Sequence, residues 1–335
     1  MAKRFHQYQA VGRALSLEGD EHPKLWATNG DSEASTSKTI TFEKEVGESR
    51  NWVEGLPHDV TVAILQKVGV IDILENVQHV CPSWHEICQD PALWRSIDMS
   101  NINHSYTSYE MFEIIKQAID RSCGQLIDIN LKYYCNDNIL KYITDDRKNQ
   151  VRRLKLVSCR DITNYGLSEA AKMMPSMEEL HLQWVNITEV GLENVGRSCP
   201  GLKSLTHNRF TALINVDDPN SEALAISRTM PQLRHLSLVG NSMTNTGLQA
   251  ILDACPHLEL LDLRKCNNVD LSGELGKICS SIKTFHHPNE FVGKNEGGRF
   301  FDDDDDNDRV YHYYYYHSDD NDVTGFISDY EGFLY

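Results

Sequence analysis

Residues 151–182, VRRLKLVSCRDITNYGLSEAAKMMPSMEELHL, contain the pattern that decides the fold. Leu154 and Leu156 alternate with a polar residue, as in a short strand with one buried face. Thr163 then precedes a helical run. It suits a helix start, because its hydroxyl can accept a hydrogen bond from a free backbone N–H group there. The strand pattern begins again at Met177, so one strand and one helix fit within 26 residues.

The frame LxxLxL recurs along the chain at nearly constant intervals. Successive frames begin 25, 26, 25, 31, 25 and 24 residues apart, and stops such as Cys199-Pro200 end the helices between them. The seven frames are Leu126-Ile129-Leu131, Val151-Leu154-Leu156, Met177-Leu180-Leu182, Leu202-Leu205-His207, Leu233-Leu236-Leu238, Leu258-Leu261-Leu263 and Ile282-Phe285-His287. Such stacked units predict an α/β fold: an open solenoid with parallel strands on the concave face and helices on the convex face.

The repeat has two irregularities. His207 and His287 stand where the frame expects Leu, which predicts a weaker core in those two units. The long interval before Leu233 predicts an inserted loop within Arg209–Glu222, since insertions in such arrays map to loops.

Upstream of the repeats, residues 52–98 read WVEGLPHDVTVAILQKVGVIDILENVQHVCPSWHEICQDPALWRSID. The apolar spacing predicts three short helices, with Pro57 and Pro82 at positions where a helix tolerates a missing N–H group. About 40 residues cannot bury all of these apolar side chains among themselves, so some must face another surface. A degenerate frame, Trp94-Ile97-Met99, predicts that this helical segment joins the solenoid without a flexible linker.

Four parts are expected along the chain. They are a disordered leader at residues 1–50, the helical segment at 51–98, about seven repeats at 99–288 and a disordered acidic, Tyr-rich tail at 289–335. The last 36 residues hold eleven acids and one base, and so carry −10 of the chain's net charge of −17. The block Tyr311–Tyr316 within them is either a phosphorylation or binding segment or simply part of the disordered tail.

Composition excludes several classes of function. An acidic body without a basic stripe argues against nucleic acid as a partner. No apolar run is long enough for a membrane span or a signal peptide, so we expect no membrane partner and a location in the nucleus or the cytoplasm, or both. The nine cysteines are scattered and form no CxxC pair, so they are expected to be free thiols, either packed in the core or acting as redox sensors.

No motif in the sequence indicates catalysis. A nucleophile elbow, a phosphate-binding glycine loop and metal-ligand spacing are all missing from the sequence. We therefore expect a non-enzymatic protein with no cofactor and no metal, and an enzyme such as a hydrolase is disfavoured.

The helical segment resembles an F-box, and the solenoid resembles the cysteine-containing class of leucine-rich repeats. The F-box resemblance is carried by Leu56, Pro57, Asp59, Val60, Ile64, Leu65, Val80, Cys81, Trp84, Ile87, Asp90, Pro91, Leu93, Trp94 and Arg95. The repeat resemblance is carried by Cys159 and Cys266 after the strands and by Cys123, Cys199, Cys255 and Cys279 at helix ends. Together they make residues 52–288 similar to plant F-box/leucine-rich-repeat proteins.

The resemblance implies a substrate-recognition adaptor of a Skp–cullin–F-box ubiquitin ligase. The F-box would bind a Skp-family adaptor protein and through it a cullin, while the repeats hold an unknown protein target. The alternative is a non-catalytic scaffold that binds Skp without assembling a cullin ligase. By family analogy, the candidates for the Skp-facing surface are Leu56, Pro57, Ile64, Leu65, Val68, Leu74 and Val80. Of these, Leu56, Pro57 and Leu65 are expected to be exposed in the free chain, with the three helices packed against the first repeat.

The candidate target-binding surface is the concave face of the solenoid. Side chains that interleave with the buried frame positions should point out from it, namely Lys155, Val157, His181, Gln183, Trp184, Thr206, Asn208, Ser237, Val239, Asp262 and Arg264. Trp184 is either an exposed anchor for a protein target or a cover for the adjacent repeat.

Overall fold

The computed structural model describes residues 56–101, 106–145, 150–209 and 218–292. The described residues up to Glu290 form one compact unit, which contains all of the helices and strands named below. The predicted leader, the tail from residue 293 onward with its Tyr-rich block, and most of the predicted insertion loop lie outside the described residues.

Short helices form the first described part of the unit. The α-helices are α2 (His58–Leu65), α3 (Val70–Glu75) and α4 (Pro82–Ile87), and the 3-10 helices are η1 (Val77–His79) and η2 (Pro91–Trp94). The three predicted α-helices are confirmed. Pro82 and Pro91 lie in the first turns of their helices, where the missing N–H group would have no helical partner. The Asp90 side chain starts η2 by accepting a hydrogen bond from Ala92 N at 2.8 Å.

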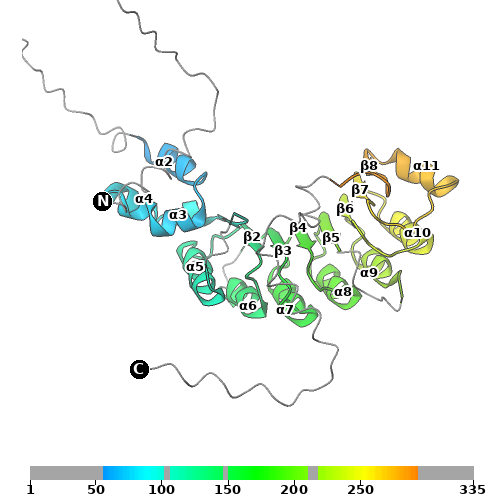
Figure 1. Ribbon diagram of the computed structural model, residues 1–335, viewed down its shortest axis with the longest axis horizontal. Coiled ribbons are helices and arrows are strands. Elements are labelled where there is room, and N and C mark those ends of the chain that lie inside the picture. The colour runs from blue at the N-terminus through cyan, green and yellow to red at the C-terminus, as the bar shows by residue number, and fades with distance from the viewer. Residues whose placement is uncertain (1–55, 102–105, 146–149, 210–217, 293–335) are drawn as a thin grey trace, which may run out of the picture. The chain divides into compact units, whose positions relative to one another are not determined.

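A parallel sheet follows, with its strands in sequence order (Figure 1). The strands are β1 (Ser96–Met99), β2 (Asp128–Lys132), β3 (Arg153–Val157), β4 (Glu179–Gln183), β5 (Ser204–Asn208), β6 (His235–Ser237), β7 (Leu260–Asp262) and β8 (Thr284–His286). Every predicted frame supplies one strand, and the degenerate frame supplies β1. Frame residues pair with each other, as Leu154 does with Leu180, because a shift of one residue would turn each buried side chain outward.

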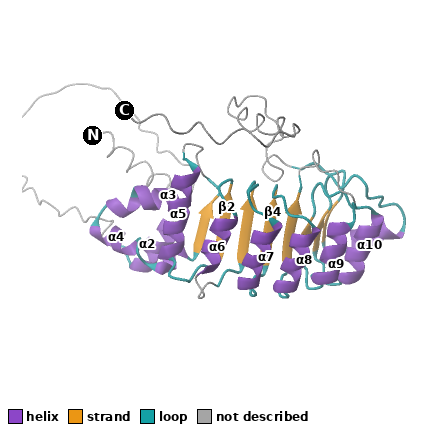
Figure 2. Cartoon of the chain, turned by 90° about the horizontal axis from the view of Figure 1, so that it is seen from below, coloured by secondary structure: helices purple, strands orange, loops and turns teal. Residues whose placement is uncertain are grey.

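One helix follows each strand from β1 to β7, and all of these helices lie on the same side of the sheet (Figure 2). They are α5 (Ser108–Arg121), α6 (Asp137–Asp145), α7 (Asn164–Met173), α8 (Glu189–Ser198), α9 (Ser221–Thr229), α10 (Asn245–Ala254) and α11 (Glu274–Ser281). The core lies between the helices and the sheet, and the other face of the strands carries the polar side chains.

Two threonines cap their helices with their own side chains, as the sequence predicted for Thr163. Thr107 and Thr163 do so, accepting hydrogen bonds from Glu110 N and Gly166 N at 3.2 and 3.1 Å. Thr188 and Thr244 make no such bond within their own helices. A side chain of the preceding repeat takes over the role of acceptor.

Asparagine and aspartate side chains link neighbouring repeats at these helix starts. Asn220 Oδ1 accepts hydrogen bonds from Thr244 N, Thr244 Oγ1 and Gly247 N at 3.0, 3.0 and 3.1 Å. Asn164 Oδ1 accepts from Thr188 N at 3.0 Å, and Asp137 accepts from Thr163 N at 2.9 Å. We call Asp137, Asn164 and Asn220 the inter-repeat ladder. Asn245 Oδ1 also bonds the next repeat, accepting from Asp270 N at 2.8 Å, but in the loop that precedes α11. Orphan donors of one helix are thus satisfied by the previous repeat.

The helical segment and the solenoid share one hydrophobic core, as the sequence predicted. Helix α3 contacts both α5 and β1, and η2 contacts α5. Trp94 is 1% exposed, and its Nε1 donates to Cys88 O at 2.9 Å. Arg121 of α5 lies over the Trp94 ring at 5.3 Å and donates from Nη1 to Cys88 O at 3.3 Å. These contacts bind the first repeat to the helical segment without a linker.

Candidate functional site

The first candidate surface is made of the apolar side chains that the helical segment leaves open to solvent. Pro57, Val60 and Val80 are exposed there, with Val60 at 41% and Val80 at 40%. Leu56, Ile64 and Val68 are partly exposed. We call these six residues the N-terminal face. Apolar side chains left open in this way favour a protein partner.

Two residues predicted for this face are buried instead. Leu65 is 1% exposed and Leu74 is 5% exposed, so the expectation that Leu65 stays open in the free chain is wrong. Leu65 belongs to the inner side of α2, which also holds Thr61 and Val62, and it packs in the shared core. Pro57 is exposed, as expected, and Leu56 is half-buried, so the expectation for Leu56 is met only in part.

The prediction missed Val60 as a member of the N-terminal face. A signal for it was available, because Val60 and Ile64 are four residues apart in α2 and therefore lie on the same side of that helix. The apolar spacing of α2 marks both an inner and an outer side, and only the packing distinguishes them.

The second candidate surface is the concave face, where predicted residues form rows across the strands. The register brings Lys155, His181, Thr206, Ser237 and Asp262 into one row. Gln183 and Asn208 pair in the next row, beside Val157.

Several residues predicted for this face are placed differently. Val157 is 8% exposed and Asp262 is 4% exposed, so neither is an open contact residue. Asp262 is held instead by Arg264, whose Nη2 lies 2.7 Å from Asp262 Oδ2. The burial follows from local pairing and packing, which the alternation of residues does not encode.

Trp184 follows β4 and does not belong to the strand. It has a φ of 56°, and its N–H group donates to Asn208 O at 3.0 Å. Tyr133 and Ser158 take the same left-handed conformation directly after β2 and β3. Trp184 is partly exposed and lies at the rim where the strands end. Whether it anchors a protein target or covers the adjacent repeat stays a prediction.

The polar row is bonded internally toward both ends. Asn130 Nδ2 donates to Asp98 Oδ1 at 2.9 Å on the side of β1. Toward β8, Ser237 Oγ donates to Asn208 Oδ1 at 2.9 Å, and Val239 N donates to the same oxygen at 3.0 Å. Asp98, Ser237 and Asn208 are thus engaged within the protein, while the buried Oδ1 of Asn130 has no hydrogen-bond partner among the described residues.

The middle of the row is open. We call Lys155, His181 and Thr206 the open centre. The side chains of Lys155 and Thr206 form no hydrogen bond or ion pair with any residue that the structure describes. His181 Nε2 lies 3.8 Å from Glu179 Oε2, beyond hydrogen-bond distance. Burial and the neighbouring charge of Lys155 lower the pKa of His181, against the opposing effect of Glu179.

His207 occupies the predicted irregular position and is 1% exposed. Its Nε2 lies 3.4 Å from Glu222 Oε1, and Arg209 forms an ion pair with the same oxygen. Asn241 Nδ2 donates to Glu222 Oε2 at 2.7 Å. A buried charged cluster therefore replaces the Leu packing of the regular units. Burial alone would raise the pKa of Glu222, but His207, Arg209 and Asn241 outweigh it and hold that pKa below its ordinary value.

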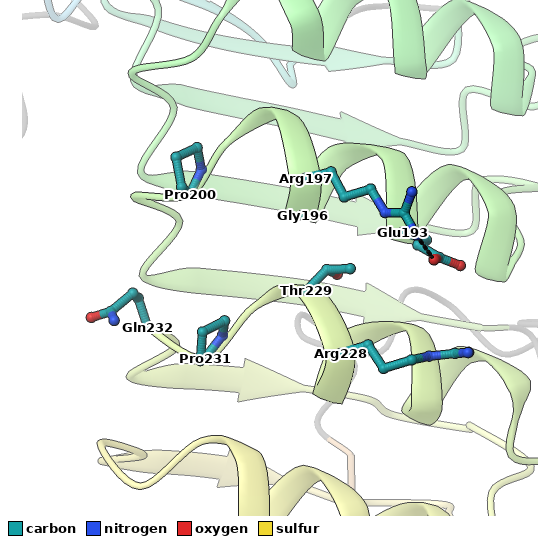
Figure 3. A pocket seen from close by; sticks show the side chains of 8 residues that line it. All are labelled: Glu193, Gly196, Arg197, Pro200, Arg228, Thr229, Pro231 and Gln232. Carbon is teal, nitrogen blue, oxygen red and sulfur yellow. Dashed lines mark hydrogen bonds and ion pairs between the residues drawn. The ribbon is translucent and has the colours of Figure 1, made fainter.

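A groove of about 510 Å³ lies on the convex side between the C-terminal parts of α8 and α9 (Figure 3). Its two arginines are engaged locally: Arg197 pairs with Glu193, and Arg228 Nε donates to Leu224 O at 3.0 Å. The groove contains none of the predicted site residues and brings together no catalytic pair of groups.

The cysteines and the metal-ligating residues do not form a reactive site in the described ranges. Within residues 56–292, less the gaps, no group of three or more His, Cys, Asp or Glu side chains could hold a metal ion. Burial raises the pKa of Cys199 to about 12 and that of Cys255 to about 11, which favours packing over redox sensing at these positions. No helix among the described residues has the length and apolar character that crossing a membrane requires.

The fold defines the class of protein as a strand–helix repeat solenoid that is continuous with a short N-terminal helical segment. The F-box-like family model matches residues 53–100, and the Leucine Rich repeat model matches residues 229–252. F-box protein SKIP19 of Arabidopsis thaliana is 44% identical over 260 residues, which span 77% of this chain and 84% of the relative. The chain belongs to the plant F-box/leucine-rich-repeat family.

A second relative and one solved structure show how far the similarity extends. F-box/LRR-repeat protein 23 of Arabidopsis thaliana is 40% identical over 272 residues, which span 80% of this chain and 60% of the relative. Among solved structures, a chain in the complex of Rad7 and Elc1 in yeast gives a TM-score of 0.41 at 17% identity, covering 71% of this chain and 66% of that chain.

Proposed function

We propose that the protein is the substrate-recognition adaptor of a Skp–cullin–F-box ubiquitin ligase. The observation that carries the proposal is the N-terminal face: an apolar surface left open on a domain that shares its core with the solenoid. Family membership supports the proposal, since F-box/leucine-rich-repeat proteins are generally non-catalytic adaptors. In this role the N-terminal face binds a Skp-family protein, and the concave face binds the target.

The continuous core suggests how such an adaptor works. Helix α3 and α5 are in contact, and Arg121 holds the Trp94 ring and Cys88 O, so the two surfaces cannot move apart freely. A target on the concave face is then held at a set distance from the docked Skp subunit. Such a geometry raises the effective concentration of the target's lysines near the transferring enzyme without any catalytic group in this chain.

The test is a pull-down of a purified Skp-family protein by the full chain and two single variants. Val80→Asp places a charge on the N-terminal face and is expected to weaken Skp binding by at least about tenfold, because an unpaired charge in an apolar interface costs more than about 1.4 kcal/mol. Val190→Asp is the matched control, because Val190 is 52% exposed on α8 of the solenoid. Equal binding by both variants would contradict the assignment of the N-terminal face.

Cullin co-purification then distinguishes the ligase adaptor from a scaffold that binds Skp alone. Recovery of a cullin with the wild-type chain, lost with Val80→Asp, supports the adaptor. Recovery of Skp without any cullin supports the scaffold. We place the protein in the nucleus, the cytoplasm or both, which imaging of a fluorescent fusion tests.

A further inference from the structure

The open centre presents hydrogen-bond donors at consecutive places on three neighbouring strands. Lys155 pairs in register with His181, and His181 pairs with Thr206. Neighbouring strands lie about 4.8 Å apart, so the three side chains can reach the oxygens of a single carboxylate. Lys155 is exposed, and His181 and Thr206 are partly exposed, so a ligand can approach all three.

The charges around the open centre leave one cation without a counter-ion among the described residues. Asp128, one strand away from Lys155, is neutralised by Arg153, whose Nε lies 2.9 Å from Asp128 Oδ2. Glu179 lies beside His181 and makes no ion pair with Lys155. Lys155 therefore offers its three N–H donors to a ligand, with no carboxylate paired to it among the described residues.

We propose that the concave face docks an acidic segment of a protein target, and that Lys155, His181 and Thr206 hold a target Asp or Glu carboxylate. The inference rests on the proposed function, because it names the chemistry of the target that the adaptor presents. On either side of the open centre, Asn130 donates to Asp98 and Ser237 donates to Asn208, whereas the side chains of Lys155 and Thr206 have no hydrogen-bond or ion-pair partner among the described residues.

The proposal predicts that binding takes up a proton at His181. In the free protein, burial and Lys155 lower the pKa of His181, while Glu179 on its own strand and Asp128 on β2 oppose them. A docked carboxylate adds a negative charge and raises that pKa, so affinity increases as the pH falls from about 7.5 to about 5.5, still above the pKa of an ordinary Glu. Thr206 on β5 and Asn130 on β2 add no charge that would reverse this sign.

Fluorescence anisotropy with the full chain tests the proposal. The probe is a fluorescein-labelled, glutamate-rich peptide, and the control probe is the same peptide with glutamine at each glutamate. Both are measured at about 0.15 M salt, where charges farther apart than about 8 Å are screened. We expect the glutamate peptide to bind and the glutamine peptide to bind at least about tenfold more weakly, as loss of charged hydrogen bonds requires.

Variants locate the site. Lys155→Gln is expected to weaken glutamate-peptide binding about tenfold. Lys172→Gln changes the net charge equally on α7 of the same repeat, where Lys172 pairs with Glu169, and is expected to change binding by less than about twofold. His181→Gln is expected to remove the rise in affinity at low pH, and Glu179→Gln to tighten binding at neutral pH.

Two results would overturn the proposal: equal weakening by Lys155→Gln and Lys172→Gln, or equal binding of the two peptides to the wild-type chain. Circular dichroism melts identify any variant that has lost its fold. The Skp pull-down on the same preparations is independent, because the peptide is added without Skp. Loss of Skp binding with normal peptide binding refutes the adaptor, and the reverse result refutes the acidic target.

Discussion

Replacement of Asn220 by Ala tests whether the inter-repeat ladder stabilises the solenoid. Asn220 Oδ1 is the acceptor for Thr244 N, Thr244 Oγ1 and Gly247 N, and all three bonds are partly buried. A typical intramolecular hydrogen bond contributes about 0.5–1.5 kcal/mol, and loss of a helix cap costs about 0.5–2 kcal/mol. The three bonds share one oxygen and are not additive, so we expect a loss of about 2 kcal/mol in the free energy of unfolding.

Urea unfolding followed by circular dichroism measures this change. Asn268→Ala is the matched control, because Asn268 joins the next pair of repeats, those of β6 and β7, through a single exposed bond from Nδ2 to Ser242 O at 2.8 Å. That variant is expected to lose less than about 0.5 kcal/mol. Hydrogen exchange at the Gly247 amide gives a local measurement, since this N–H group should lose protection in Asn220→Ala. Equal stability of the two variants, with Gly247 still protected, would refute the ladder's role.

The remaining predictions concern packing and buried charge. Gly191→Ala is expected to lower the free energy of unfolding by about 1–3 kcal/mol, because the added Cβ would lie 2.6 Å from Asn164 Oδ1. Gly201→Ala is the control, because a Cβ there would have no atom within 4 Å. Equal urea midpoints for the two variants would contradict this prediction. Glu222→Gln is expected to cost about 3 kcal/mol at neutral pH, because Arg209 stays buried without its partner. The pKa of Glu222 is lowered in the folded protein, so the difference in free energy of unfolding between wild type and Glu222→Gln should stay constant down to about pH 4.5. It should then shrink as the pH falls through the folded pKa. A difference that stays constant under acid would contradict the ion-pair explanation.

Sequence periodicity predicts the strands well, because one buried face leaves a strict alternation. The frame holds even at β1, where Ile97 and Met99 pair with Ile129 and Leu131. The sequence shows that His207 replaces the Leu of the frame, but it does not show that a buried charged cluster forms there. The partners Arg209 and Glu222 lie on either side of the long connection, so their pairing depends on tertiary structure alone.

The candidate sites were harder to predict, because the packing of side chains decides which residues are exposed. Periodicity in α2 cannot separate Leu65, which packs inward, from Val60, which faces outward, since both belong to apolar sides of a short helix. The row containing Lys155 and His181 follows directly from the frame. Which members of that row are occupied by neighbours depends on side-chain geometry, as Asp262 and Arg264 show.

The inter-repeat ladder also bears on how such a chain can change over evolution. Because Asn220 completes the helix start that holds Thr244, a repeat gained or lost by recombination leaves one acceptor without donors or one helix start without its acceptor. A repeat can therefore be gained or lost without this defect only where the two units that become neighbours supply the acceptor at one helix start and its donors at the next.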